Sequence, residues 1–173
     1  NMASVHDTYH TLLTLFHEDM HDEAFTWSRQ TLSYPTPDFG PPAALDNAGP
    51  LPGDVEIPGG AHVLGAVGDE PFIFDNEKWG HRVDIAPFRM ARAPVTNAEY
   101  ADFIAHGGYA DRRFWDDQGW RWREIEGAEH PVYWRRDGLG WQGREFQDWG
   151  ALRPHAPVIH VCWHEARAFC RWA

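Results

Sequence analysis

Two histidines four residues apart, His17 and His21, are the residues whose type and spacing most clearly allow chemistry. Side chains at i and i+4 of a helix project from the same face, so both imidazoles can bind one metal ion. The stretch HEDMHDE that contains them also holds four carboxylates, which can orient ligating imidazoles. Histidines with open coordination positions suit Fe(II) or another divalent transition metal better than calcium. We therefore predict a metal site with His17 and His21 as ligands.

Other interpretations of these histidines remain open. The pair could belong to a solvated, charged helix face, although it lies beside the apolar stripe of the helix rather than opposite it. His6 and His10 repeat the same spacing nearer the start of the chain. The letters from His17 to His21 also satisfy H-E-x-x-H, the zinc-protease signature, with Glu18 as general base. Such a hydrolase needs a third ligand further on, where the sequence instead becomes rich in proline.

A long helix must position this pair. Between residues 4 and 32, apolar residues recur mostly three and four positions apart, which predicts an amphipathic helix. Pro35 and Pro37 end the pattern because proline lacks the backbone donor and restricts the residue before it. A single helix cannot bury its own apolar face, so we expect partner helices.

A linker and a second, α+β part should follow. Residues 35–54 contain six prolines, which favours an extended linker. Short strands are expected within VEIPGGAHVLGA, PFIFD and HRVDIAPFRMA. Thr96 and Glu99 form a capping-box pattern at the start of a helix that Gly107 and Gly108 should end. We predict irregular loops over 109–150, then a strand over 157–162 that leads into a last helix.

Composition narrows the class of function. The 173 residues carry a formal net charge of −11, which argues against a general nucleic-acid binder. No apolar run is long enough to cross a membrane, and the first residues do not resemble a signal peptide. Cys162 and Cys170 would lie about 12 Å apart on one helix, too far for a disulfide. Free thiols fit a reducing cytoplasm, so we expect a cytoplasmic protein.

Residues 17–23 resemble the H-x3-H-x-E pattern on the last helix of the four-helix, DinB-like bundle of the ergothioneine-biosynthesis sulfoxide synthases. The later part resembles the formylglycine-generating-enzyme-type, C-type-lectin-like domain that follows this bundle in that family. The matching phrases are FIFDNE (72–77), APFRMARAPVTNAEYADFI (86–104), HGGY (106–109) and PVIHVCWHEARAFCRWA (157–173). The resemblance implies an α+β chain in three parts. These are the last helix of a partial bundle (1–34), the linker (35–54) and the N-terminal part of the second domain (55–173).

The resemblance also implies an activity. Members are mononuclear non-haem Fe(II) enzymes that use three histidines, O2 and a thiol to join sulfur to the imidazole C2 of hercynine, a histidine betaine. Relatives act on histidine itself, or use a selenosugar and form the carbon–selenium bond of selenoneine. His17 and His21 match two ligand positions, and Glu23 matches the acid of the motif, which acts through the ligands. Since both ends of the chain interrupt helical patterns, we expect the third histidine on an earlier helix and the catalytic residues beyond Ala173.

One departure concerns the residue before the second histidine. It is often a glutamine that faces the substrate in the family, and here it is Met20, whose thioether cannot make the same hydrogen bonds. This leaves the selenoneine-synthase branch open.

Two further alternatives come from the second part. It could be a non-catalytic, lectin-like module that binds a ligand through its many tryptophans, since aromatic faces attract cations. A formylglycine-generating oxidase is the weaker alternative, because Cys162 and Cys170 do not match the cysteines that such enzymes use.

Overall fold

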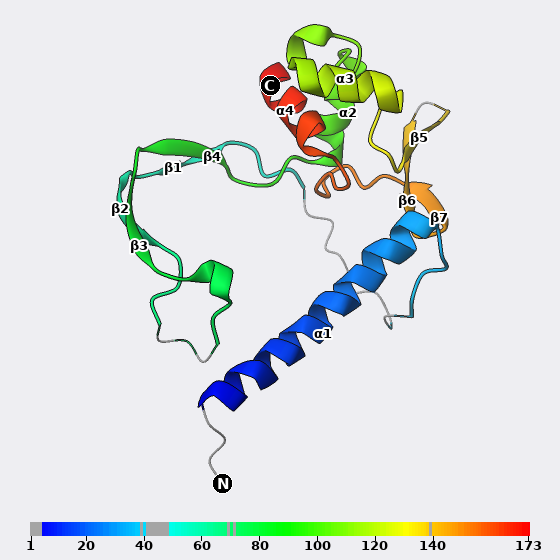
Figure 1. Cartoon of the computed structure of the whole chain (residues 1–173). Helices are drawn as coiled ribbons and strands as arrows, with labels where there is room; N and C mark the ends of the chain where they lie inside the picture. Colours follow the sequence, from blue (N-terminus) through cyan, green and yellow to red (C-terminus); the bar gives the residue numbers. More distant parts are fainter. Residues whose placement is uncertain (1–4, 39, 41–48, 69, 71, 139) are drawn as a thin grey trace. The chain divides into compact units, whose positions relative to one another are not determined.

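The computed structural model describes residues 5–38, 40, 49–68, 70, 72–138 and 140–173, and the side chains from residue 8 onward (Figure 1). Contacts divide the chain into two compact units. Unit 1 comprises Asn1–Leu32 and Gly53–Arg92, and unit 2 comprises Ser33–Pro52 and Ala93–Ala173. Helices and strands are mixed, so the expected α+β class is confirmed. Within the described ranges, no helix is long and apolar enough to span a bilayer.

Unit 1 contains the long helix and two β-ribbons. Helix α1 (Val5–Leu32) has the extent predicted from its apolar repeat, within the described residues. Strands β1 (Asp54–Ile57) and β4 (Phe88–Ala91) pair antiparallel, as do β2 (Gly60–Leu64) and β3 (His81–Ile85).

The strand predicted over PFIFD is wrong. Residues 72–74 have no regular structure, and Asp75–Glu77 form a 3-10 helix, η1. The Phe74 N–H donates to Glu77 Oε2 at 3.1 Å, a local bond that replaces a strand partner. The rings of Phe72 and Phe74 lie 4.8 Å apart and pack on α1. Phe72 and Phe74 are therefore apolar because they contact α1, and they do not belong to a β-sheet.

Helix α2 (Asn97–Ala105) begins unit 2's core and has the predicted start. The Thr96 hydroxyl accepts from the Glu99 N–H at 3.3 Å, and Glu99 accepts from the Thr96 N–H at 2.8 Å. Gly107 follows the helix with φ of +81°, a conformation that glycine adopts without strain. Both ends of this helix are thus confirmed.

The irregular region predicted over 109–150 is wrong in large part. It contains a 3-10 turn η2 (Arg112–Phe114), helix α3 (Asp117–Glu126) and an antiparallel meander of β5 (Trp134–Asp137), β6 (Gly140–Glu145) and β7 (Asp148–Ala151). The aromatic and arginine residues of this region follow no sustained helical or strand period. Caps delimit α3 instead: Asp116 accepts from the Gly119 N–H at 2.7 Å, and Gly127 ends the helix with φ of +60°.

Residues 157–162 do not form the predicted strand. They contribute an isolated bridge between Thr96 and Pro157, with Val158 donating to the Val95 carbonyl at 2.9 Å. The predicted last helix is present as α4 (Trp163–Trp172), with Cys162 as its N-cap. Both cysteines are free, as expected.

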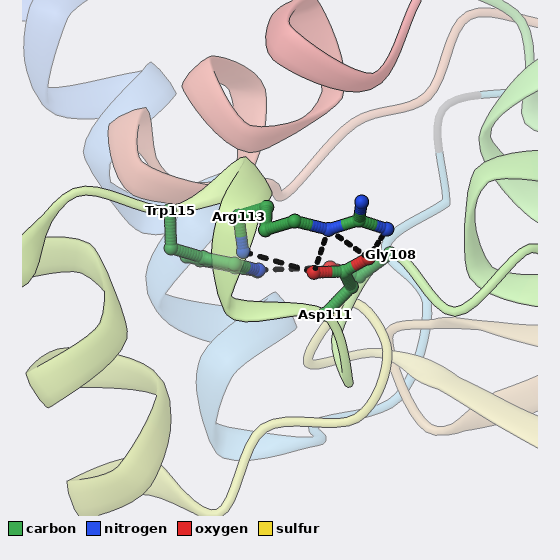
Figure 2. A network of polar contacts seen from close by, with 4 residues as sticks. All are labelled: Gly108, Asp111, Arg113 and Trp115. Atoms are coloured by element: carbon green, nitrogen blue, oxygen red, sulfur yellow. Dashed lines mark hydrogen bonds and ion pairs between the residues drawn. The ribbon is translucent and has the colours of Figure 1, made fainter.

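The core of unit 2 is aromatic. Tyr100 and Phe103 from α2 are almost fully buried, and Ala168 from α4 packs with them. The loop after α2 contributes Trp115 to this core, and the Trp115 indole N–H donates to the Gly108 carbonyl at 2.8 Å (Figure 2). In the same loop, Asp111 accepts from the backbone and the guanidinium of Arg113. One buried hydrogen bond and a set of exposed polar contacts therefore hold the loop between α2 and α3.

Candidate active site

Helix α1 brings the predicted histidine pair together. The Nε2 atoms of His17 and His21 lie 3.0 Å apart, and their rings are nearly perpendicular, at 87°. Since metal–imidazole bonds measure about 2.0–2.1 Å, both nitrogens can bind one ion. Both side chains are exposed and therefore accessible to an ion or a ligand. The donor set fits two positions of a divalent transition metal.

The neighbours of the pair are also exposed. Met20 has 55% of its surface accessible, which leaves its thioether free to face a ligand. Glu23 is exposed on the same helix, two residues after His21. Among the described residues, no group of three or more histidine, cysteine or acidic side chains is placed so that it could hold a metal ion. The competing pair includes His6, whose side chain lies outside the described residues.

The FIFDNE segment carries a local polar cluster. Lys78 Nζ donates to Asp75 Oδ1 at 2.9 Å, and the Tyr9 hydroxyl donates to the same atom at 3.3 Å. The hydrogen bond from Lys78 lowers the pKa of Asp75 below its usual value. The sequence Asp75-Asn76-Glu77 allows either a cation site or a hydrogen-bonded loop, and these contacts favour the loop.

The tryptophans of unit 2 serve mainly as core. Trp115 and Trp134 are buried, and others pack partly buried against them: Trp120, Trp122, Trp141 and Trp172. Trp149 lies under the guanidinium of Arg135, whose central carbon is 4.1 Å from the ring centroid. A cation of the chain itself therefore occupies the face of this ring. These contacts favour a structural role over a ligand-binding cage.

The start of α4 holds a buried carboxylate, Glu165, which was not among the predicted site residues. Glu165 is only 3% exposed; it accepts a short hydrogen bond from the Tyr109 hydroxyl and another from the Cys162 N–H at 2.7 Å. The Tyr100 hydroxyl lies 3.3 Å from that of Tyr109. Burial raises the pKa of both tyrosines, so both stay protonated donors at neutral pH. The sequence signal that could have identified Glu165 is its position three residues after Cys162, the N-cap of α4, where an acid commonly accepts from the N-cap N–H.

Cys162 is a poor candidate nucleophile. Burial raises the pKa of its thiol, which disfavours the reactive thiolate. Its position as the N-cap of α4 explains its presence structurally.

Comparison with known proteins gives two kinds of relative. Residues 42–173 match the family model of the sulfatase-modifying factor enzyme 1-like domain. Hercynine oxygenase of Mycolicibacterium thermoresistibile is 39% identical over 96% of this chain, and that of Mycolicibacterium smegmatis is 38% identical over 93%. Formylglycine-generating enzyme of Streptomyces coelicolor is 30% identical over 76% of the chain.

The chain spans 37% of the length of both hercynine oxygenases and 48% of the Streptomyces enzyme. The family match begins at residue 42 and continues to residue 173, well over half of the sequence. On this match, the chain belongs to the sulfatase-modifying factor enzyme 1-like domain family.

Proposed function

We propose that the protein is an Fe(II)- and O2-dependent oxidoreductase that acts on hercynine and forms a carbon–sulfur bond at the imidazole C2. The observation that carries the proposal is the His17–His21 pair, with Nε2 atoms 3.0 Å apart on an exposed helix. Iron would be held by these two imidazoles and a third donor, and it would supply the activation of O2 and of the thiol. A carbon–selenium bond from a selenosugar donor is the variant that Met20 leaves open.

The extent of similarity supports this proposal over a formylglycine-generating activity. The similarity to hercynine oxygenase covers 96% of the chain and must therefore include most of α1. The formylglycine-generating enzymes match 69–76% of the chain. Helix α1, with its histidine pair, is thus part of the likeness to the first group, and we propose that it is the last helix of a DinB-like bundle.

The chain's own residues would then have separate roles. His17 and His21 would hold the metal as neutral imidazoles. Glu23 would orient an imidazole, and Met20 would face the substrate. None of these roles requires the buried Glu165, which we assign to stability.

Anaerobic titration of the intact protein with Fe(II), in the presence of hercynine, tests the proposal. We expect one-to-one binding in the wild type and its loss in His17→Ala and in His21→Ala. Glu23→Gln should weaken binding by about tenfold, the usual cost of losing a group that orients a ligand. His10→Ala, an exposed histidine of the same helix, is the matched control and should bind normally.

A second readout connects the metal with turnover. Addition of O2 and a thiol to the loaded wild type should consume hercynine, and both histidine variants should be inactive. Unchanged Fe(II) binding in His17→Ala and His21→Ala would refute the site. Binding of hercynine without any metal would favour the lectin-like module instead.

A further inference from the structure

An aromatic cluster within unit 1 joins α1 to the segment that precedes η1. Phe16 on α1 lies with its ring centroid 5.0 Å from Phe72 and 5.9 Å from Phe74. Tyr9, also on α1, stacks on Phe72 at 5.1 Å. We call Tyr9, Phe16, Phe72 and Phe74 the aromatic cluster. One ring, Phe72, thus contacts two positions of the helix that are seven residues apart.

Polar contacts reinforce this cluster at the Tyr9 end. The Tyr9 hydroxyl donates to Asp75 Oδ1, the atom that also accepts from Lys78. The Lys78 ammonium lies 5.2 Å from the centroid of the Tyr9 ring, within cation–π range. Residues 72–78 therefore contact α1 through ring stacking on Phe72, a hydrogen bond to Asp75 and the cation–π contact of Lys78.

The β2–β3 ribbon carries the segment. The Ala66 N–H donates to the Glu77 carbonyl at 2.9 Å, and the Gly80 N–H donates to the Ala66 carbonyl at 2.7 Å. These backbone bonds close the base of the loop between the two strands. Hydrogen bonds at the base of the loop and ring contacts at Phe72 and Phe74 thus connect the ribbon with one face of α1.

That face lies next to the histidines. Tyr9 directly precedes His10, and Phe16 directly precedes His17. Successive residues of a helix are separated by about 100° around its axis. When the ribbon holds the face of Tyr9 and Phe16, it also determines the direction in which His17 and His21 project.

We propose that Phe16, Phe72 and Phe74 are positioning residues for the proposed metal centre, which they aim toward a donor outside α1. This inference rests on the proposed function. The helix alone sets the 3.0 Å separation of the two nitrogens, but it does not set their direction relative to the rest of unit 1. Direction matters because the described residues hold no group of three candidate ligands, so the proposed centre needs a further donor beside His17 and His21.

Co(II) is a suitable probe because its visible absorption reports the ligand geometry. In the intact protein, Phe16→Leu and Phe72→Leu should each weaken Co(II) binding by about tenfold and change the absorption bands. The loss of affinity in the double variant should be smaller than the sum of the two single losses, since both single variants remove the contact between Phe16 and Phe72. Phe72→Tyr, which keeps a ring, should restore wild-type binding. Phe25→Leu, on the same helix at a position that is 66% exposed, is the control and should bind normally.

The results separate the two proposals. Wild-type affinity and spectrum in the leucine variants, with binding lost in His17→Ala, would overturn the positioning role and leave the metal site intact. No Co(II) or Fe(II) binding by the wild type would overturn both. If a leucine variant melts below the assay temperature, Asp75→Ala replaces it, because it removes the acceptor of Tyr9 and Lys78 without removing a ring. An unchanged Co(II) spectrum in Asp75→Ala would count against the positioning role.

Discussion

Glu165 is a buried carboxylate of unit 2 whose charge depends on hydrogen bonds from its neighbours. Its carboxylate is buried, and its two oxygens accept hydrogen bonds from different elements, the Tyr109 hydroxyl and the Cys162 N–H. The position in the first turn of α4 also favours a negative charge, because the helix dipole is positive there. A buried carboxylate without these partners would destabilise the fold.

Removal of a single hydroxyl tests this account. Tyr109→Phe should lower the free energy of unfolding by about 1.5–3 kcal/mol, because it removes a hydrogen bond to a charged group. Tyr100→Phe removes only the contact between two hydroxyls and should cost about 0.5–1.5 kcal/mol. Urea unfolding of both variants measures the difference. Equal losses would mean that Glu165 does not depend on the Tyr109 hydroxyl.

At the scale of elements, the end of α2 depends on the close approach of the Gly108 backbone to the Phe103 ring. A Cβ at Gly108 would lie 2.2 Å from an atom of the Phe103 ring, which is fully buried. The Gly108 carbonyl also accepts from Trp115, so the backbone cannot move away without losing a buried hydrogen bond. Glycine is therefore required here by packing, whereas at Gly107 it is favoured by the positive φ.

Gly108→Ala should consequently destabilise unit 2 by at least about 1–3 kcal/mol, the usual cost of overpacking a core. Gly150→Ala is the matched control, since a Cβ there would meet nothing within 4 Å. Its effect on stability should stay within about 0.5 kcal/mol. Thermal or urea unfolding of both variants provides the comparison, and similar stabilities would contradict the packing argument.

At the scale of the whole molecule, the buried tyrosines predict a loss of stability at alkaline pH. Burial raises the pKa of Tyr100 and of Tyr109 in the folded chain. Above pH about 10, the unfolded chain releases these protons while the folded chain keeps them. Their contribution is therefore complete below pH about 10 and declines above it, by about 1.4 kcal/mol per pH unit for each tyrosine.

Urea unfolding at pH 8 and at pH 11 checks this dependence. The wild type should lose more stability between the two values than the variant with Tyr100→Phe and Tyr109→Phe. The comparison cancels the titration of other groups, which both proteins share. Parallel losses in the two proteins would show that the buried tyrosines do not control the alkaline transition.

Several features were predictable from the sequence because they depend on neighbours along the chain. Helix α1, the capping box of α2 and the 3.0 Å approach of His17 to His21 all follow from contacts within four residues. The expected free cysteines follow from the same helical geometry. Such local rules need no information about the fold.

Other features were decided only by the tertiary structure. The FIFDNE segment has a strand-like composition, yet Phe72 and Phe74 pack on a helix more than fifty residues away in sequence. Glu165 is buried, and one of its hydrogen-bond donors, Tyr109, lies 56 residues earlier in the chain. The meander of β5 to β7 likewise depends on strand pairing that weak local periodicity does not reveal. By itself the sequence determined the histidine pair and the helix ends, since short-range hydrogen bonds specify them. Burial, and the direction in which the pair projects within unit 1, depend on long-range packing, which only the folded chain supplies.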